Sequence, residues 1–267
     1  MIDAIDHIAV ATNDLDAASA GFAALFGIAA TPIERADGAA TTRFQLANMA
    51  LVLAAPDGEG AEGDAVRAKL EAGDGILRLA FAARDLAETS RLLGRRGLPS
   101  RPAGDGAVDL DLEATHGAAI RVIERDAAPR PSLSSDAVQA LDHIVIGTPN
   151  PDRAVAIYGA RLGLDFRLDR SNPQWGARQI FFRCGGAVVE IGARIGAEAT
   201  DGPDRLSGLA WRVTDPDAAQ ARIAKAGFDV SEVRVGRKPG TKIFTIRSGV
   251  PGAPTVMLSA EPQTEDA

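Results

Sequence analysis

A long internal repeat is the feature that most constrains how this chain folds. Residues 5–12, with the sequence IDHIAVAT, align without a gap with residues 141–148, LDHIVIGT. The same alignment carries Gly27 onto Gly163. Self-similarity over such a distance indicates duplication of a whole folding unit. We therefore expect two halves of one architecture, and the length of 267 residues gives each half enough chain for its own core.

Each half contains a second, shorter repeat. Residues 76–98 align with residues 206–228, and this alignment pairs Asp85 with Asp215. Both segments show the order of strand, helix cap, helix and closing glycine that also starts each half of the chain. The chain is thus predicted to hold four copies of one unit.

The first part of the unit follows from its hydrophobic period and its turn residues. Ile8 and Val10 alternate with smaller or polar neighbours, which predicts a strand. Asn13 or Asp14 is the expected helix N-cap, and Gly27 is expected to end the helix. The expected buried stripe of this helix consists of Leu15, Ala18, Phe22 and Leu25.

The third copy shows most clearly which strands follow the helix. Asn150 and Pro151 supply an N-cap and a first helical position. Strand-like runs then follow at residues 166–171, 178–184 and 187–193. Each unit is therefore expected to be βαβββ, and the fold class is α+β with four such units.

Domain boundaries follow from a change in composition. Residues 126–139 hold prolines and serines without apolar periodicity, which is typical of a linker. We expect an N-terminal domain at residues 1–125 and a C-terminal domain at residues 140–261.

The face of each strand can be assigned because the helix must cover one side of its sheet. The more apolar alternation, such as Ile8 with Val10, is expected to face the helix, so His7 faces the open side. The full set of first-strand and last-strand residues predicted on open faces is His7 with Val52, Arg78 with Arg121, His143 with Glu190, and Gly208 with Met257.

These motifs resemble the vicinal oxygen chelate (VOC) superfamily of glyoxalase, bleomycin resistance protein and extradiol dioxygenase-like proteins. The resemblance rests on the fourfold unit, the opening Leu/Ile-Asp-His-Ile strand and the Asn-Asp or Asn-Pro-Asp start of its helix. It covers about residues 4–260, and residues 141–190 are most similar to bacterial glyoxalase-like proteins. It implies two glyoxalase-like domains in tandem, each with a curved mixed β-sheet flanked by helices. Because this scaffold carries unrelated reactions, the resemblance defines the fold better than the chemistry.

The resemblance also implies one divalent metal ion, held by side chains of first and last strands. In such proteins the ion binds neighbouring substrate oxygens as a Lewis acid, which needs two or three His, Glu or Gln ligands. Here His143 and Glu190 fill both positions of the third unit, and His7 fills one position of the first. The units can pair within each half, or the first with the fourth and the second with the third, and neither arrangement completes three protein ligands. The choice among Mg, Mn, Fe, Ni and Zn stays open, as does the presence of any ion.

Three interpretations of His143 with Glu190 stay open. The two residues can ligate a metal ion, form a hydrogen-bonded pair in which His143 acts as a general base, or play a structural part. The second half is expected to be the active half, because only it keeps both polar groups of one unit. His143 is therefore the candidate catalytic residue, and His143 with Glu190 are the candidate metal ligands.

Arg78 and Arg121 are candidates for binding an anionic substrate. They share one predicted open face, and arginine forks bind carboxylate and phosphate groups through two parallel hydrogen bonds. The alternative is that each pairs with a neighbouring Asp or Glu of the chain.

Two further places are candidates for contact with a substrate. Arg237 and Lys238 lie in a glycine-flanked turn that can close over an acidic substrate or form an ordinary exposed hairpin. Trp175, with Arg178 close behind it, can stack on a flat ligand or pack over the sheet edge.

Composition excludes several classes of partner. The formal net charge is −7, whereas a surface for duplex nucleic acid concentrates Lys and Arg, so no nucleic-acid partner is expected. The chain has no run of about 18 apolar residues, so no membrane span is expected. A single cysteine suits a reducing compartment, and we expect a cytoplasmic protein that is a monomer or a homodimer.

Three classes of function remain for a protein with a small-molecule partner. The first is a metal-dependent lyase, isomerase or dioxygenase that acts on a small oxygenated molecule. This molecule can be anionic if the candidate arginines bind it. The second is a metal-free protein that binds or sequesters a small molecule, as the resistance proteins of the superfamily do. The third is a metal-free enzyme in which His143 moves a proton and an arginine holds an oxyanion.

Overall fold

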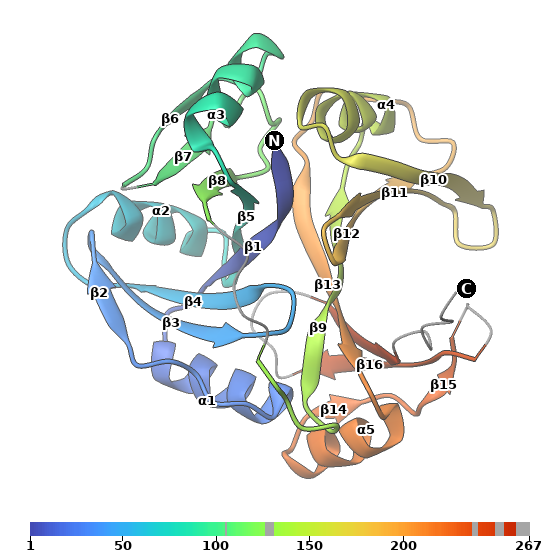
Figure 1. Cartoon of the computed structure of the whole chain (residues 1–267). Coiled ribbons are helices and arrows are strands. Elements are labelled where there is room, and N and C mark those ends of the chain that lie inside the picture. Colours follow the sequence, from blue (N-terminus) through green and yellow to red (C-terminus); the bar gives the residue numbers. More distant parts are fainter. Residues whose placement is uncertain (105, 126–130, 237–239, 249–253, 260–267) are drawn as a thin grey trace.

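The computed structural model describes residues 1–104, 106–125, 131–236, 240–248 and 254–259. Its strands form two mixed sheets, one from each half of the chain (Figure 1). The first two units therefore share one sheet and the last two share the other, which answers the question of unit pairing that the sequence left open.

The N-terminal sheet comes from the first two units. The first unit contains β1 (Ile2–Ala11), α1 (Leu15–Phe26), β2 (Glu34–Ala36), β3 (Ala39–Gln45) and β4 (Ala50–Pro56). The second contains β5 (Gly75–Ala83), α3 (Leu86–Arg95), β6 (Ser100–Pro102), β7 (Ala107–Leu110) and β8 (Ile120–Glu124). Between them lies α2 (Ala61–Leu70), a helix that the repeat did not predict. The strand order is β2-β3-β4-β1-β5-β8-β7-β6, with β1 and β5 antiparallel at the centre.

The C-terminal sheet repeats this plan. The third unit contains β9 (Val138–Gly147), α4 (Pro151–Val155), the π-helical turn η1 (Ala156–Arg161), β10 (Asp165–Asn172), β11 (Ala177–Cys184) and β12 (Ala187–Arg194). The fourth contains β13 (Arg205–Val213), α5 (Pro216–Lys225), β14 (Asp229–Val230), β15 (Arg234–Val235), β16 (Lys242–Ser248) and β17 (Thr255–Ser259). The strand order is β10-β11-β12-β9-β13-β17-β16-β14, with β15 paired to β16. The prediction of an α+β fold with four βαβββ units is confirmed.

The predicted sequence signals place the helices. Asp14 caps α1, because its carboxylate accepts a hydrogen bond from the backbone N–H of Ala17 at 2.9 Å, and Gly27 ends the helix with a left-handed backbone. Asn150 caps α4 in the same way, with Pro151 at the start of the helix. The predicted stripe of Leu15, Ala18, Phe22 and Leu25 is buried. Among the described residues, no helix has the length and apolar character needed to span a bilayer.

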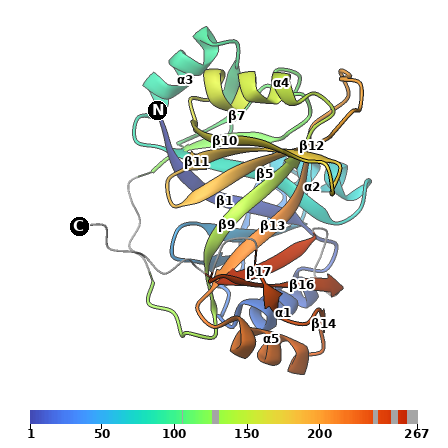
Figure 2. The ribbon, with the colours of Figure 1, turned by 90° about the vertical axis from the view of Figure 1, so that its right-hand side faces the viewer.

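The helix-covered sides of the two sheets meet in one continuous core. α1 lies beside α5 at one end of the molecule, and α3 lies beside α4 at the other (Figures 1 and 2). Phe26 of α1 packs edge to face on Trp211 of β13, with ring centroids 4.9 Å apart. Arg222 of α5 donates hydrogen bonds to the last carbonyls of α1, those of Ala24 and Leu25. The opposite face of each sheet, the predicted open face, does not contribute to this shared core.

α2 covers the open face of the N-terminal sheet. It contacts β1, β3, β4 and β5, and its Val66 is fully buried. Gly63 lets the helix approach the turn before β3, because a Cβ at Gly63 would lie 2.1 Å from the carbonyl oxygen of Gly38. Val66 completes a small apolar cluster with Ala9, Ala11, Ala39, Ala54 and Leu77. No described helix lies over the corresponding face of the C-terminal sheet (Figure 1).

The predicted open-face position of Met257 is wrong. Met257 is fully buried in the core, and its strand partners Phe244 and Trp211 are fully buried beside it. Because side chains alternate along a strand, Val256 takes the open-face position in β17. Side-chain bulk decides this register, since Met257 fills space between large aromatic rings, whereas our rule compared only how apolar the two alternations are.

Candidate functional site

His143 and Glu190 meet on the open face of the C-terminal sheet. They lie on the adjacent strands β9 and β12, and His143 Nε2 is 3.5 Å from Glu190 Oε2. The side chain of His143 is 22% exposed and that of Glu190 is 9% exposed, so a ligand can reach the histidine while the carboxylate is held largely in protein. The two residues are in contact range, and their chemical role stays a prediction.

Asp142 and Arg212 orient the imidazole from behind. Asp142 Oδ1 is 2.8 Å from His143 Nδ1, and Asp142 Oδ2 accepts a hydrogen bond from Arg212 Nε at 2.8 Å. Burial opposes ionisation of Asp142, but the hydrogen bonds from His143 and Arg212 outweigh it and lower the pKa of Asp142 to about 2. An ionised Asp142 favours a proton on Nδ1, which leaves Nε2 as the nitrogen that faces Glu190.

Gln179 of β11 orients the carboxylate. Its side-chain Nε2 donates a hydrogen bond to Glu190 Oε1 at 2.6 Å, while Glu190 Oε2 faces His143. When the imidazole is neutral, both facing atoms carry lone pairs, so a proton, a ligand hydroxyl or a cation between them stabilises the arrangement. The two facing atoms can therefore share one positively charged or proton-donating group.

Two more side chains extend this face toward the sheet edge. Phe181 is the cross-strand partner of Glu190, and Arg170 of β10 is the partner of Gln179. The Arg170 guanidinium lies over the Phe181 ring, with Cζ 5.0 Å from the centroid. Gln179, Phe181 and Arg170 were not predicted as site residues. Strand alternation could have found Gln179 and Phe181, since every second residue of β11 shares the face of Glu190, and Arg170 follows from its pairing with Gln179.

The donor set of this face does not complete a metal centre. His143 and Glu190 supply one imidazole nitrogen and one carboxylate. The matching positions of the fourth unit are Gly208 and Val256, whose side chains offer no ligand atom. No group of three His, Cys, Asp or Glu side chains suited to a metal ion occurs in the described part of the chain.

The N-terminal domain keeps the Asp-His pair and loses the second polar group. His7 Nδ1 is 2.7 Å from Asp6 Oδ1, and Arg125 pairs with the other oxygen of Asp6. Burial lowers the pKa of His7. Although burial works against it, hydrogen bonds from His7 and Arg125 hold the pKa of Asp6 well below its usual range. Val52 stands where Glu190 stands in the other domain. His7 and Val52 line a cavity of about 330 Å³ between this sheet face and α2.

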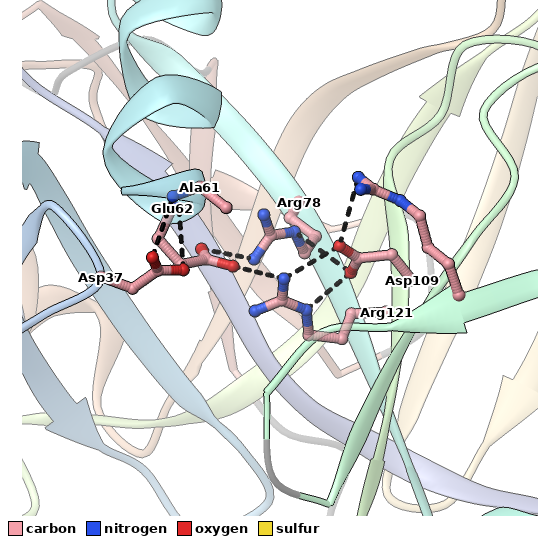
Figure 3. Close-up of polar contacts among 7 residues, drawn as sticks. Asp37, Ala61, Glu62, Arg78, Asp109 and Arg121 are labelled. Carbon is pink, nitrogen blue, oxygen red and sulfur yellow. Dashed lines mark hydrogen bonds and ion pairs between the residues drawn. The ribbon is translucent and has the colours of Figure 1, made fainter. Parts of the chain in front are cut away.

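Arg78 and Arg121 are already paired with carboxylates (Figure 3). Glu62 of α2 accepts a hydrogen bond from Arg78 at 3.0 Å and another from Arg121, and Asp109 accepts one from Arg121 Nε at 2.6 Å. Asp37 caps α2 by accepting hydrogen bonds from its first backbone N–H groups. Although burial works against it, the arginines keep the pKa values of Glu62 and Asp109 below their usual range. Both arginines thus pair with Asp or Glu residues of the chain, which was the alternative to binding an anionic substrate. We therefore do not propose them as an anion site.

Arg178 lies on the wrong side of its strand for a ligand at Glu190. Its guanidinium pairs with Asp169 at 2.8 Å and with Asp152 of α4 at 3.0 Å, both on the helix side of the sheet. Hydrogen bonds to Asp169 and Asp152 raise its pKa. Gln179, the next residue, takes the face of Glu190 because side chains alternate along β11. The predicted substrate contact of Arg178 is therefore not carried forward.

The remaining predicted contacts are at the surface or not described. Trp175 is 60% exposed in the turn between β10 and β11, and its stacking role stays a prediction. Arg237 and Lys238 lie outside the described residues.

Comparisons with known proteins identify the family. A model of a glyoxalase-like domain matches residues 5–121, and a model of the glyoxalase/bleomycin resistance protein/dioxygenase superfamily matches residues 142–245. The chain belongs to this superfamily, and it is a tandem member with two glyoxalase-like domains.

Solved structures agree with this assignment of the fold. A mutant 4-hydroxymandelate synthase from Streptomyces coelicolor superposes with a TM-score of 0.74 at 15% identity, over 100% of this chain and 95% of that one. A xylose isomerase-like TIM barrel/4-hydroxyphenylpyruvate dioxygenase fusion protein superposes with a TM-score of 0.70 at 13% identity, over 100% of this chain and 50% of that one. Likeness at such identity establishes the fold alone. No curated protein sequence matches the chain.

Proposed function

We propose that this protein acts on a small oxygenated molecule bound over the open face of its C-terminal sheet, with His143 as the proton-transferring residue. One observation carries the proposal: His143 and Glu190 converge, each with its own orienting hydrogen bond, on a sheet face that no described helix covers. A lyase or isomerase reaction, in which a proton moves next to a substrate oxygen, suits this arrangement.

The proton transfer follows from the surroundings of the imidazole. With Nδ1–H donated to Asp142, Nε2 of His143 is the basic nitrogen. A substrate C–H bond beside a carbonyl group gives its proton to Nε2, and the bonding electron pair passes to the carbonyl oxygen. The imidazolium so formed lies between the carboxylates of Asp142 and Glu190, which stabilise its charge.

A metal-assisted reaction is the second candidate. It is favoured by the convergence of an imidazole nitrogen and a carboxylate oxygen, since both are ligand types that divalent ions take. Two protein ligands leave most coordination positions to water or substrate oxygens and bind an ion weakly. Added Mn²⁺ or Ni²⁺ would then raise the melting temperature of wild type and of His7→Ala, but not that of the double variant His143→Ala with Glu190→Ala.

The test of the main proposal is hydrogen exchange at carbon. Wild-type protein is incubated in D₂O with a panel of small hydroxy- and oxo-carbonyl compounds, and proton NMR follows loss of the C–H signals. We expect exchange with wild type and with His7→Ala, and none with His143→Ala. Exchange that survives in His143→Ala but not in His7→Ala would contradict the proposal. Binding of panel compounds to wild type without exchange would replace it with the binding or sequestering alternative.

A further inference from the structure

Arg170 is a half-buried arginine that has no acidic partner in the described part of the chain. Its Nε is buried and finds no hydrogen-bond acceptor there. Comparable arginines are satisfied by oxygen atoms, as Arg121 is by Asp109 and Arg212 is by Asp142. A guanidinium that is partly removed from water and has no ion pair among the described residues can take an acceptor from outside the chain through its outer N–H groups.

Phe181 holds this guanidinium in place. Arg170 Cζ lies 5.0 Å from the centre of the Phe181 ring. Stacking uses the flat face of the guanidinium and leaves the N–H groups along its edge for an oxygen acceptor. Because the ring already restricts the side chain, less conformational freedom is lost when a ligand binds.

Strand pairing places Arg170 on the face of the His143–Glu190 pair. Arg170 is the cross-strand partner of Gln179, and Gln179 donates a hydrogen bond to Glu190. β10 and β12 lie on either side of β11, so their backbones are roughly 10 Å apart in a sheet with ordinary strand spacing. The long side chain of Arg170 shortens this gap, and a molecule of a few carbon atoms spans from its guanidinium to His143.

We propose that Arg170 binds a carboxylate of the molecule that the C-terminal face takes up, which makes the substrate class a small hydroxy- or oxo-carboxylic acid. This inference rests on the proposed function, and it names the substrate class for the same site. A planar carboxylate matches the two parallel N–H groups of a guanidinium edge. Arg212 is occupied by Asp142, whereas Arg170 has no ion pair among the described residues and is held on this face by Phe181.

The test uses matched pairs of probes that differ only in charge. Each hydroxy- or oxo-dicarboxylic acid, such as 2-hydroxyglutarate, is compared with the compound in which the far carboxylate is a carboxamide. Isothermal titration calorimetry on the full chain measures the affinity of both. We expect wild type to bind the acids at least about tenfold more tightly than the amides. Arg170→Gln should remove this preference, and Arg170→Lys should keep part of it because the charge remains without the fork.

Two controls make the result specific. Arg167→Gln changes an exposed arginine of the same strand that pairs with Asp165, and it should leave the acid preference unchanged. Melting temperatures close to wild type would show that the Arg170 variants are folded. Equal binding of acids and amides by wild type, no binding of the acids, or a preference that survives Arg170→Gln would each overturn the inference. If amides bind in a manner that depends on His143, the proposed function stands even when the inference about Arg170 fails.

Discussion

The two domains share one sheet plan and one Asp-His pair, yet their open faces differ in what covers them. In the N-terminal domain, α2 lies on the sheet, and its Val66 and Glu62 fill apolar and charged positions of that face. In the C-terminal domain, the face carries His143, Glu190 and a stacked Arg170, with no described helix over it. The two copies of the scaffold therefore differ in that α2 covers part of one sheet face, whereas no described helix covers the other.

The two domains also differ in whether the arginines of their open faces form ion pairs with carboxylates of the chain. Arg78 and Arg121 are matched by Glu62 and Asp109 within the N-terminal domain. Arg170 has no such partner among the described residues. The paired arginines of the N-terminal face are already committed to carboxylates of the chain, whereas an arginine without an ion pair is suited to a charged ligand.

The largest expected effect comes from breaking the contact between α2 and the sheet. Val66→Asp places a carboxylate in the apolar cluster that covers the N-terminal face, and we expect a loss of about 4 kcal/mol in the free energy of unfolding. Urea titration followed by circular dichroism measures this loss. Ala68→Asp introduces the same side chain on the exposed side of α2 and should change stability by less than about 1 kcal/mol. Equal effects of the two variants would show that α2 is not packed on this face.

A smaller effect separates the two kinds of open-face arginine. Arg121→Ala removes one of the two arginines that pair with the partly buried carboxylates of Glu62 and Asp109, and we expect a loss of about 2 kcal/mol in unfolding free energy. Arg170→Ala breaks no ion pair and should stay within about 0.5 kcal/mol of wild type. The same urea titration gives both values. A larger loss for Arg170→Ala than for Arg121→Ala would reverse the contrast between the domains.

The pH dependence of stability tests the orientation of His143. The pKa of Asp142 is about 2 in the folded protein against 3.8 for an unperturbed carboxyl, so its contribution is present above about pH 4 and is lost as pH falls toward 2. Asp142→Asn should remove about 2 kcal/mol of this pH-dependent stability. Thermal melts between pH 2 and pH 6 measure it. Asp201→Asn, at an exposed loop position, should leave the profile unchanged, and a wild-type profile in Asp142→Asn would contradict the hydrogen-bond account.

Much of the fold was predictable because local signals and the repeat agree. Asp14, Gly27 and Asn150 mark helix ends by their own chemistry, and the duplicated Asp-His strand fixes which segments correspond. The same alternation brought His143 and Glu190 to one face. These features depend on residues that are close in the sequence, so they can be predicted without knowing how distant segments pack.

The missed features depend on contacts between distant segments. α2 has a weak apolar stripe, in which Val66 is the buried anchor, and its helix is fixed by capping from Asp37 and by Glu62 on two arginines. The repeat segments at residues 5–12 and 76–98 are further apart in the sequence than those at residues 141–148 and 206–228, which already indicates extra chain at this connection. The core position of Met257 and the unpaired state of Arg170 follow from side-chain bulk and from partners elsewhere, which periodicity does not report.

The most direct measurement compares access to the two open faces at equivalent positions. Ala9 and Val145 align in the repeat, and Ala9 is buried under α2 whereas Val145 is half-buried. Cys184 gives little background, because burial raises the pKa of its thiol to about 12. Iodoacetamide labelling of Ala9→Cys and Val145→Cys, followed by mass spectrometry, gives the two rates. We expect labelling at position 145 to be at least about tenfold faster than at position 9. Equal rates, or faster labelling at position 9, would show that α2 does not shield the N-terminal face.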